Sequence, residues 1–223
     1  TDRSSDYSLV ALQGPRSFEV LQKLNLGFEA KDSEYYSIQQ EVTGTTPTMI
    51  ARTGYTGEDG FEIFASHDNI KLIWKQMMDN GVKPCGLGAR DVLRLEVCFP
   101  LYGNELNDEV TPLDSGLKWT VKMDKEDFIG KAALSEYKPK YRLLKIKLDK
   151  GIPREGYPIE SATGEVIGSI TSGTMSVMLG KGVALARVDK NLYSPDVEIN
   201  VDIRGRKYAA EILKKPFVTG GHK

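Results

Sequence analysis

Two strands are predicted on either side of the segment Arg52-Thr53-Gly54-Tyr55-Thr56-Gly57-Glu58-Asp59-Gly60. Residues 48–51 precede it and residues 61–64 follow it, and both stretches are short runs of mainly apolar residues, as is typical of strands. The glycines at positions 54, 57 and 60 allow the backbone to turn sharply and to approach a ligand closely. We therefore expect two strands joined by a glycine-rich loop that brings side chains to a binding site.

Further strand and helix patterns flank this pair of strands. Residues 8–13 predict a strand, and Pro15 then favours the first turn of a helix with one apolar face. Asp68 is suited to cap a second helix, whose apolar positions we expect in the core: Ile70, Ile73, Trp74 and Met77. Residues 86–96 and the stretch that begins at residue 130 predict short helices, and residues 117–121 predict a strand. The first half of the chain thus mixes helices and strands.

The pattern changes after residue 140. Apolar residues alternate with lysines in residues 144–148 and with polar residues in residues 197–203, which is the period of two expected for strands. Residues 166–170, 183–188 and 208–213 are further strand candidates. Several short strands without a long helix favour a small antiparallel barrel or sandwich. We predict an α+β protein, with an α/β core domain in residues 1–138 and a C-terminal β-barrel domain in residues 139–223.

Composition limits the classes of function. The 223 residues carry 30 basic and 31 acidic side chains, so the net charge of -1 gives no sign of a nucleic-acid partner or of an anionic membrane surface. No apolar stretch approaches the roughly 20 residues that span a bilayer. With only two histidines, His67 and His222, neither a zinc site nor any other metal site is expected. Cys85 and Cys98 are too few for a disulfide scaffold, so we expect unpaired, buried thiols in a reducing compartment.

Glu62 is the strongest candidate for ligand binding from spacing. It follows the glycine-rich loop, and alternation puts Phe61 and Ile63 on one face of the strand and Glu62 and Phe64 on the other. A carboxylate in this setting can accept two parallel N–H bonds from the edge of an aminopyrimidine ring. The alternative is a solvated glutamate at the surface of an edge strand, and spacing does not separate the two.

Two further groups of residues suit a ligand site. Arg90 and Arg94 share a helix face, where each needs an anion such as Asp91, Glu96, another carboxylate or a ligand. Tyr102 and Trp119 are aromatic residues in polar loops, and such rings either pack in a core or stack on a flat ligand. Spacing alone supports no more than a possible site of carboxylate, arginine and aromatic groups.

Several motifs in order resemble those of the glycine cleavage T-protein family, the tetrahydrofolate-dependent aminomethyltransferases. They are Leu12-Gln13-Gly14-Pro15, the stretch from Arg52 to Glu62, Gly88-Ala89-Arg90-Asp91, Leu101-Tyr102-Gly103-Asn104-Glu105, Gly151-Ile152-Pro153-Arg154 and Thr171-Ser172-Gly173-Thr174. Each motif alone is weak, but their order and spacing from Leu12 to Phe217 are specific. The chain starts without a signal peptide or an initiating methionine. The resemblance therefore implies the C-terminal portion of such an enzyme, without its N-terminal segment.

The resemblance also implies a reaction. A lipoylated H-protein presents an aminomethyl group, ammonia is released, and the one-carbon unit passes to tetrahydrofolate as the acceptor substrate. Glu62 and Arg90 match folate-site residues, Tyr55, Tyr102 and Trp119 are assigned to the same site, and Arg154 and the turn at residues 171–174 to its mouth. The aspartate central to catalysis would lie outside this chain, so no catalytic residue is assigned. The expected compartment is the cytoplasm in a bacterium or the mitochondrial matrix in a eukaryote.

Three other interpretations of the sequence stay open. One is a folate-binding relative without aminomethyl transfer, such as those that maintain iron–sulfur clusters. Another is the folate-binding tail of a flavin-dependent dimethylglycine or sarcosine dehydrogenase. The third is a non-catalytic interaction module, in which the glycines of the loop are purely structural.

Overall fold

The computed structural model describes residues 1–223 except residues 25, 28–32, 42–46, 196–197, 220 and 222–223. The chain forms two compact units. The first unit comprises Thr1–Leu93 and Thr219–Lys223, and the second unit comprises Arg94–Val218. The predicted α+β class with a C-terminal antiparallel barrel is confirmed.

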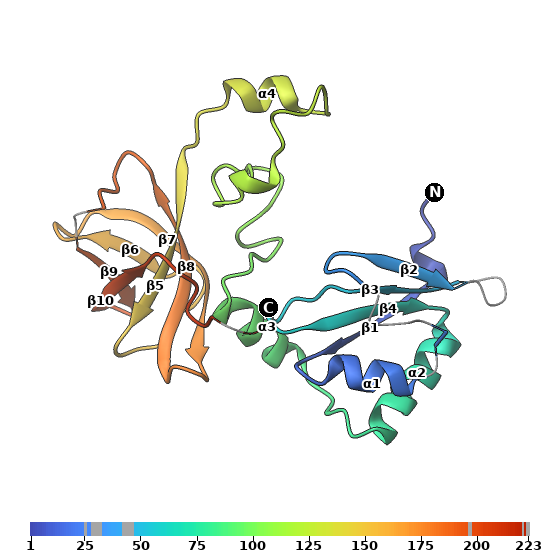
Figure 1. The fold of residues 1–223 in the computed structure, drawn as a ribbon. Coiled ribbons are helices and arrows are strands. Elements are labelled where there is room, and N and C mark those ends of the chain that lie inside the picture. Colours follow the sequence, from blue (N-terminus) through green and yellow to red (C-terminus); the bar gives the residue numbers. More distant parts are fainter. Residues whose placement is uncertain (25, 28–32, 42–46, 196–197, 220, 222–223) are drawn as a thin grey trace. The chain divides into compact units, whose positions relative to one another are not determined.

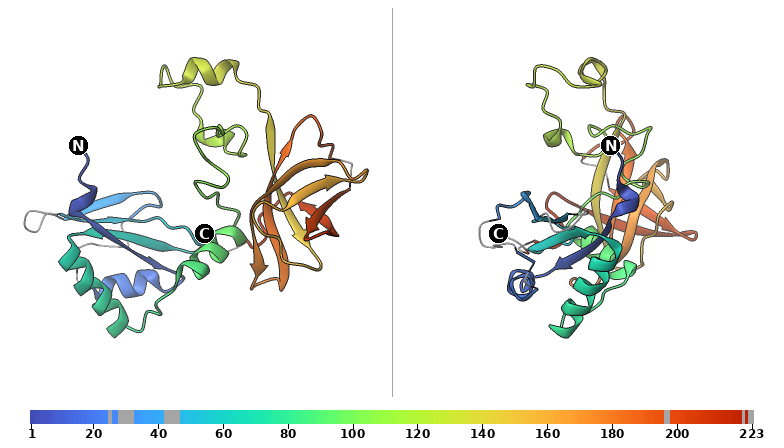
Figure 2. Two further views of the ribbon diagram at one scale, coloured as in Figure 1. Left: turned by 180° about the vertical axis from the view of Figure 1, so that it is seen from behind. Right: turned by 90° about the vertical axis from the view of Figure 1, so that its right-hand side faces the viewer.

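The first unit is a four-stranded antiparallel sheet with helices on one face (Figure 1). Along the chain, its elements are the 3-10 helix Ser4–Asp6, β1 (Ser8–Gln13), α1 (Ser17–Lys23), β2 (Ile38–Glu41), β3 (Thr48–Ala51), β4 (Gly60–Ala65) and α2 (His67–Asp79). The strand order is β1-β4-β3-β2, with Gln13 opposite Gly60 and Ala51 opposite Glu62. Figure 2 shows α1 and α2 on the same side of the sheet from a second direction. The helix α3 (Leu87–Glu96) spans the boundary between the units.

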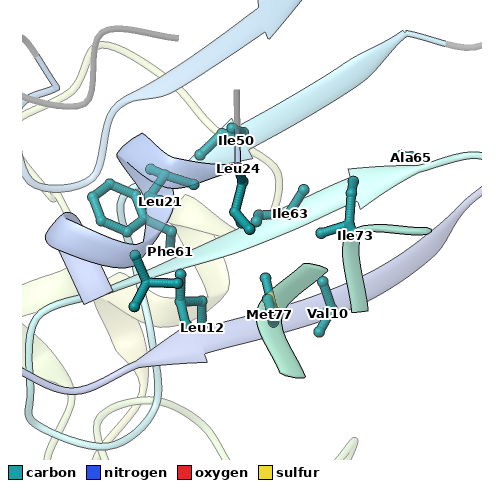
Figure 3. Close-up of a cluster of buried hydrophobic side chains, with 11 residues drawn as sticks. Val10, Leu12, Leu21, Leu24, Ile50, Phe61, Ile63, Ala65, Ile73 and Met77 are labelled. Carbon is teal, nitrogen blue, oxygen red and sulfur yellow. The ribbon is translucent and has the colours of Figure 1, made fainter. Parts of the chain in front are cut away.

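Alternation along the strands creates the core of the first unit. Val10, Leu12, Ile50, Phe61 and Ile63 are buried on the face that α1 and α2 cover. Figure 3 shows these strand residues grouped with Leu21, Leu24, Ile73 and Met77 from the helical side. Burial of large apolar side chains contributes about 1.5–3 kcal/mol each to folding, so this layer holds the sheet to its helices. Phe61 and Ile63 face the core as predicted, and Glu62 and Phe64 face away from it.

Two expectations about α2 are wrong. Ser66, not Asp68, caps the helix, since its hydroxyl accepts a hydrogen bond from the backbone N–H of Asn69. Asp68 lies inside the first turn and pairs with Lys71 at the surface. Trp74 was expected in the core but remains 44% exposed, because it lies beside the helix stripe that Ile73 and Met77 bury.

The second unit contains a closed six-stranded antiparallel barrel (Figure 1). Its elements are the 3-10 helix Lys118–Thr120, α4 (Lys131–Glu136), β5 (Tyr141–Leu148), β6 (Pro158–Ser161), β7 (Val166–Ser176), β8 (Lys181–Asp189), β9 (Ile199–Ile203) and β10 (Arg206–Leu213). The strand order around the barrel is β10-β5-β8-β7-β6-β9. Val197, predicted to begin the β9 strand, lies outside the described residues, as does His222.

The strands of the barrel bury side chains on both faces. Ala184, Ala186 and Val188 of β8 pack inside the barrel with Leu144, Ile146 and Leu148 of β5, which confirms the alternation predicted for that stretch. The intervening residues Val183 and Leu185 pack outside the barrel against Leu95 and Phe217. Because residues 182–186 of β8 are buried on both sides, that part of its sequence is a continuous apolar run without alternation.

Two local predictions for the second unit are wrong. Residues 117–121 form no strand: Lys118–Thr120 is one turn of 3-10 helix. Residues 171–174 form no turn, because they belong to the long strand β7. A shift in the pairing of β7 with β8 lies between Ile170 and Ser172, and this irregularity explains the turn-like sequence.

Asp114 fixes the chain at the start of the barrel. Its carboxylate accepts hydrogen bonds from the hydroxyls of Thr111 (2.6 Å) and Tyr137 (2.7 Å) and from the backbone N–H groups of Lys140 (2.8 Å) and Tyr141 (3.0 Å). Burial raises the pKa of Asp114, but these four donors outweigh it, and the pKa is lowered overall. The hydrogen bond to Asp114 raises the pKa of Tyr137. Asp114 therefore holds the backbone in place at residues 140–141, where β5 begins.

No helix among the described residues is long and apolar enough to cross a membrane. Cys85 and Cys98 are both free thiols. The expectation that both are buried is wrong for Cys85, which is exposed after the end of α2. Cys98 is partly buried, and this burial raises the pKa of its thiol.

Candidate functional site

The face of the sheet opposite α1 and α2 carries Glu62. We call this surface the open face and define it by Leu9, Ala11, Met49, Ala51, Glu62 and Phe64, which are partly or largely exposed. Ala11 and Ala51 are the residues opposite Glu62 on its two neighbouring strands, and Leu9 and Met49 flank Phe64 in the same way. The small alanines leave the Glu62 carboxylate accessible above an apolar floor. Among the described residues, no hydrogen bond or ion pair engages this carboxylate.

The glycine-rich loop is built around a side chain that spacing did not single out. Gln13, at the end of β1, donates to the backbone carbonyls of Thr53 (3.2 Å) and Phe61 (3.4 Å) and accepts from the Thr56 hydroxyl (3.3 Å). A Cβ atom added at Gly54 or Gly60 would lie 1.9 Å or 2.3 Å from the Gln13 amide oxygen. These two glycines thus make room for Gln13, whereas we expected them to make room for a ligand. Gly57 has a φ of 76°, a left-handed conformation that favours glycine.

An ion pair closes the base of the same loop. The guanidinium of Arg52 donates to both carboxylate oxygens of Asp59 at 3.1 and 2.9 Å and to the carbonyl of Ser33 at 2.7 Å. The bond with Asp59 raises the pKa of Arg52 further. The Asp59 carbonyl accepts from the Gly14 N–H at 2.8 Å and from the Ser17 hydroxyl at 3.1 Å. The loop is therefore tied to β1 and to the start of α1 and presents Tyr55 and Thr56 in a defined position.

Arg90 lies against this loop. Its guanidinium carbon is 4.8 Å from the centre of the Tyr55 ring, a cation–π distance. A groove of about 310 Å³ runs along β1 here, and Ala11, Gln13, Thr56, Trp74, Cys85 and Arg90 are among its lining residues. Tyr55 and Arg90 are thus in contact, whereas Glu62 is connected with this groove only through its strand partner Ala11 and is not among the lining residues.

Tyr102, Trp119 and Arg154 belong to the second unit and are exposed within it. Tyr102 is 68% exposed, and its hydroxyl donates to Asp108 at 2.6 Å, which raises the pKa of Tyr102. Trp119 is 69% exposed in the 3-10 helix. Arg154 donates to the carbonyl of Gly173 at 3.4 Å.

A buried ionic network holds the segment that carries Tyr102. Arg94 is 2% exposed and Glu105 is fully buried, and their nearest nitrogen and oxygen are 3.3 Å apart. Arg94 also donates to the hydroxyl of Ser172 at 2.9 Å, and Glu105 accepts from the Leu101 N–H at 2.8 Å. Glu105 is thus an anionic partner of Arg94. Glu96, which we had considered for this role, accepts from the Ser176 hydroxyl at 2.6 Å.

The described residues contain no group of three or more histidine, cysteine or acidic side chains that could hold a metal ion. The site of the first unit offers instead a free carboxylate, a guanidinium and an aromatic ring beside an apolar floor. This set of groups suits a flat, polar organic ligand with N–H donors on one edge.

Two family models match the chain. The model of the GCVT N-terminal domain matches residues 1–125, and the model of the glycine cleavage T-protein C-terminal barrel domain matches residues 141–219. The two models in tandem define a two-part protein whose second part is a barrel, as the structure has it. The chain belongs to the glycine cleavage T-protein family, and the resemblance found in its motifs is confirmed.

Curated relatives and a solved structure agree with this assignment. The aminomethyltransferase of Symbiobacterium thermophilum is 42% identical over all of this chain and 62% of its own length. That of Geobacillus thermodenitrificans is 43% identical over 97% of this chain and 61% of its own length. The crystal structure of the glycine cleavage system aminomethyltransferase T from Bartonella henselae superimposes with a TM-score of 0.84 at 31% identity, covering 95% of this chain and 60% of that one. The chain therefore spans about three fifths of the length of the relatives it matches.

Proposed function

We propose that this chain forms part of an enzyme that transfers a one-carbon unit from an aminomethyl group to tetrahydrofolate. The aminomethyl group is carried as a thioether on the lipoyl arm of an H-protein. Tetrahydrofolate takes up its carbon as methylene-tetrahydrofolate, while ammonia and the reduced lipoyl thiol leave. Membership of the T-protein family supports this reaction, and so do the names of the relatives.

The observation that carries the folate part of the proposal is the free Glu62 carboxylate on the open face. A pterin presents a ring N–H and an amino group side by side, and one carboxylate accepts hydrogen bonds from both. The flanking Ala11 and Ala51 leave space for a ring to reach the carboxylate, and Phe64 and Leu9 supply an apolar floor beside it. Such a floor suits a flat ring, because apolar contact and a polar edge are then satisfied together.

Arg90 and Tyr55 are proposed as the second part of the folate site. The guanidinium stays charged at all physiological pH values and is exposed beside the groove along β1. It therefore suits an anionic part of folate, while the Tyr55 ring holds the guanidinium in place. Tyr102, Trp119 and Arg154 are proposed to complete the site and its mouth, and the catalytic aspartate to come from outside residues 1–223.

The functional boundary is proposed after residue 138, with the folate-binding core in residues 1–138 and the barrel domain in residues 139–223. The start of β5 at Tyr141 and the barrel model that matches from residue 141 support this division. The compact units divide earlier, after Leu93, because the connection between α3 and the barrel packs with the barrel. For an enzyme of a bacterium, as the relatives are, we propose the cytoplasm as the place of action.

The test of the folate site is a titration of the full-length protein with tetrahydrofolate, comparing wild type with Glu62→Gln. The amide presents an N–H₂ donor where the carboxylate presents an acceptor, so one of two charge-assisted bonds is replaced by a donor–donor contact. Each such bond is worth about 1.5–3 kcal/mol, so the Kd rises at least about tenfold. Glu34→Gln, which removes an exposed carboxylate from the same unit, leaves the Kd unchanged.

The melting temperature of both variants is expected to match that of wild type, because the replacements are isosteric and Glu62 has no partner among the described residues. If Glu62→Gln binds folate as tightly as wild type does, Glu62 is a surface carboxylate without a role in folate binding. The reaction is tested separately with lipoylated H-protein loaded with the aminomethyl group. Folate binding without formation of methylene-tetrahydrofolate and ammonia would support a folate-binding relative that does not transfer aminomethyl groups.

A further inference from the structure

A second cavity lies in the second unit and contains none of the residues assigned to folate. Its volume is about 530 Å³, and it lies between the outer surface of the barrel and the segments around residues 107–110 and 137–141. Polar side chains dominate its lining: Asn107, Glu109, Tyr137, Lys140, Tyr141, Ser169, Arg187 and Asp189. A cavity of this size with charges of both signs is able to hold a small polar molecule.

Arg187 is fixed in this cavity with a donor to spare. It lies on β8 between Ala186 and Val188, whose side chains point into the barrel, so the side chain of Arg187 points outward. Its Nη2 donates to the carbonyls of Asn104 at 2.8 Å and Glu105 at 3.0 Å. Its Nε is buried and has no hydrogen-bond partner. Nη1 has no hydrogen bond among the described residues and is not among the fully buried atoms, so it is the donor that a molecule in the cavity can reach.

Asp189 places an opposite charge beside this guanidinium. It is two residues further along β8, so its side chain leaves the same face of the strand at a spacing of about 6.6 Å. Arg187 and Asp189 nevertheless form no ion pair with each other in this part of the described structure. One oxygen of Asp189 accepts from the N–H of Asn191 at 2.7 Å, which leaves the other oxygen available. Glu109 adds a second, exposed carboxylate to the lining.

We propose that this cavity binds a small zwitterionic amino acid. Its carboxylate accepts from Nη1 of Arg187, and its ammonium group lies against Asp189 and Glu109. A planar guanidinium that two carbonyls already orient suits a carboxylate, since little side-chain freedom is lost on binding. The Tyr141 ring, whose centre is 6.0 Å from the Arg187 guanidinium carbon, and the Ser169 hydroxyl complete the polar surroundings.

The test is an NMR titration of the ¹⁵N-labelled chain 1–223 with three amino acids whose charges are progressively further apart: glycine, β-alanine and γ-aminobutyrate. Acetate and methylammonium are the half-ligands, each with one of the two charges. At least one amino acid is expected to shift the backbone signals of Ser169 and Asp189 with saturation, at an affinity at least about tenfold above that of either half-ligand. No saturable shift from any amino acid up to about 10 mM would overturn the proposal.

Two variants assign the two ends of the ligand. Asp189→Asn keeps an oxygen for the N–H of Asn191 but removes the charge, so the preference for the amino acid over acetate is expected to fall at least about fivefold. Arg187→Met removes the carboxylate partner and is expected to abolish saturation by amino acid and acetate alike. Arg206→Met, an exposed arginine of β10, is the matched control and leaves the titration unchanged. If Asp189→Asn binds as wild type does, the proposed site is wrong, whatever Arg187→Met does to folding.

Discussion

The buried pair of Arg94 and Glu105 allows the sharpest prediction about stability. Arg94→Met keeps most of the apolar stem of the side chain and removes its charge. Glu105, which is fully buried, then loses its only described ion-pair partner. The hydrogen bonds from the guanidinium to the Phe99 carbonyl (3.2 Å) and the Ser172 hydroxyl (2.9 Å) are lost as well.

The size of the effect follows from burial and distance. At 3.3 Å and an effective dielectric constant of about 20, two unit charges attract by about 5 kcal/mol. Breaking a buried pair by removal of one partner typically costs about 3–5 kcal/mol, because the remaining charge stays buried without compensation. We therefore expect Arg94→Met to lower the free energy of unfolding of the second unit by about 3–5 kcal/mol. Adding Glu105→Gln to Arg94→Met removes the stranded charge and recovers about 1–3 kcal/mol.

The assay is urea unfolding of the chain 1–223, followed through the NMR signals of barrel residues such as Leu185, which report on the second unit alone. Arg90→Met is the matched control: it removes an exposed arginine four residues earlier on α3 and is expected to change stability by no more than about 0.5 kcal/mol. A loss below about 1 kcal/mol in Arg94→Met, or a double variant less stable than Arg94→Met alone, would refute the reasoning.

Three further outcomes follow from the contacts described above. Gly54→Ala is expected to destabilise the first unit by about 1–3 kcal/mol, because its Cβ would overlap the Gln13 amide, and Gln13→Ala in the same chain should restore part of that loss in thermal unfolding. Losses of stability from Gly54→Ala and Gln13→Ala that simply add would contradict the contact between these two residues. Asp114→Asn is expected to lower the free energy of unfolding by about 1–3 kcal/mol at pH 7, since an amide nitrogen would face N–H and O–H donors. An Asp114→Asn variant as stable as wild type would contradict this assignment. The pKa of Asp114 is lowered in the folded chain, so its carboxylate contributes fully to stability above about pH 4, where the carboxyl of the unfolded chain titrates. This contribution is lost as the pH falls through the pKa of the folded chain. Urea unfolding at a series of pH values should therefore show the difference in stability between wild type and Asp114→Asn narrowing below about pH 4.

Regular alternation made part of the fold predictable. β1 and β3 have the predicted bounds, because one face of each strand is buried and the other is not. β5 could be found for the same reason. β2 and β6 were missed, since β2 is exposed along most of its length and β6 is four residues long and mostly buried.

The candidate site was only partly accessible to sequence reasoning. Glu62 was placed on the correct face of its strand by its period of two. The role of Gln13 could not be found, because the glycines it contacts lie about forty residues further along the chain and only the folded sheet brings them together. Arg187 and Asp189 left a signal that was overlooked: opposite charges two residues apart, at the end of an otherwise apolar strand, share one face of it.

The anchoring of the glycine-rich loop has a consequence for the thermodynamics of binding. Gln13 contacts the start, the middle and the end of the loop through its hydrogen bonds with Thr53, Thr56 and Phe61, and Arg52 pairs with Asp59. A loop held in this way has already lost its conformational entropy during folding, at about 1–2 kcal/mol for each ordered backbone residue. A ligand that contacts Tyr55 therefore does not bear that cost again on binding. Loosening the loop at Gln13 should reduce affinity through a less favourable binding entropy, even though Gln13 itself need not touch the ligand.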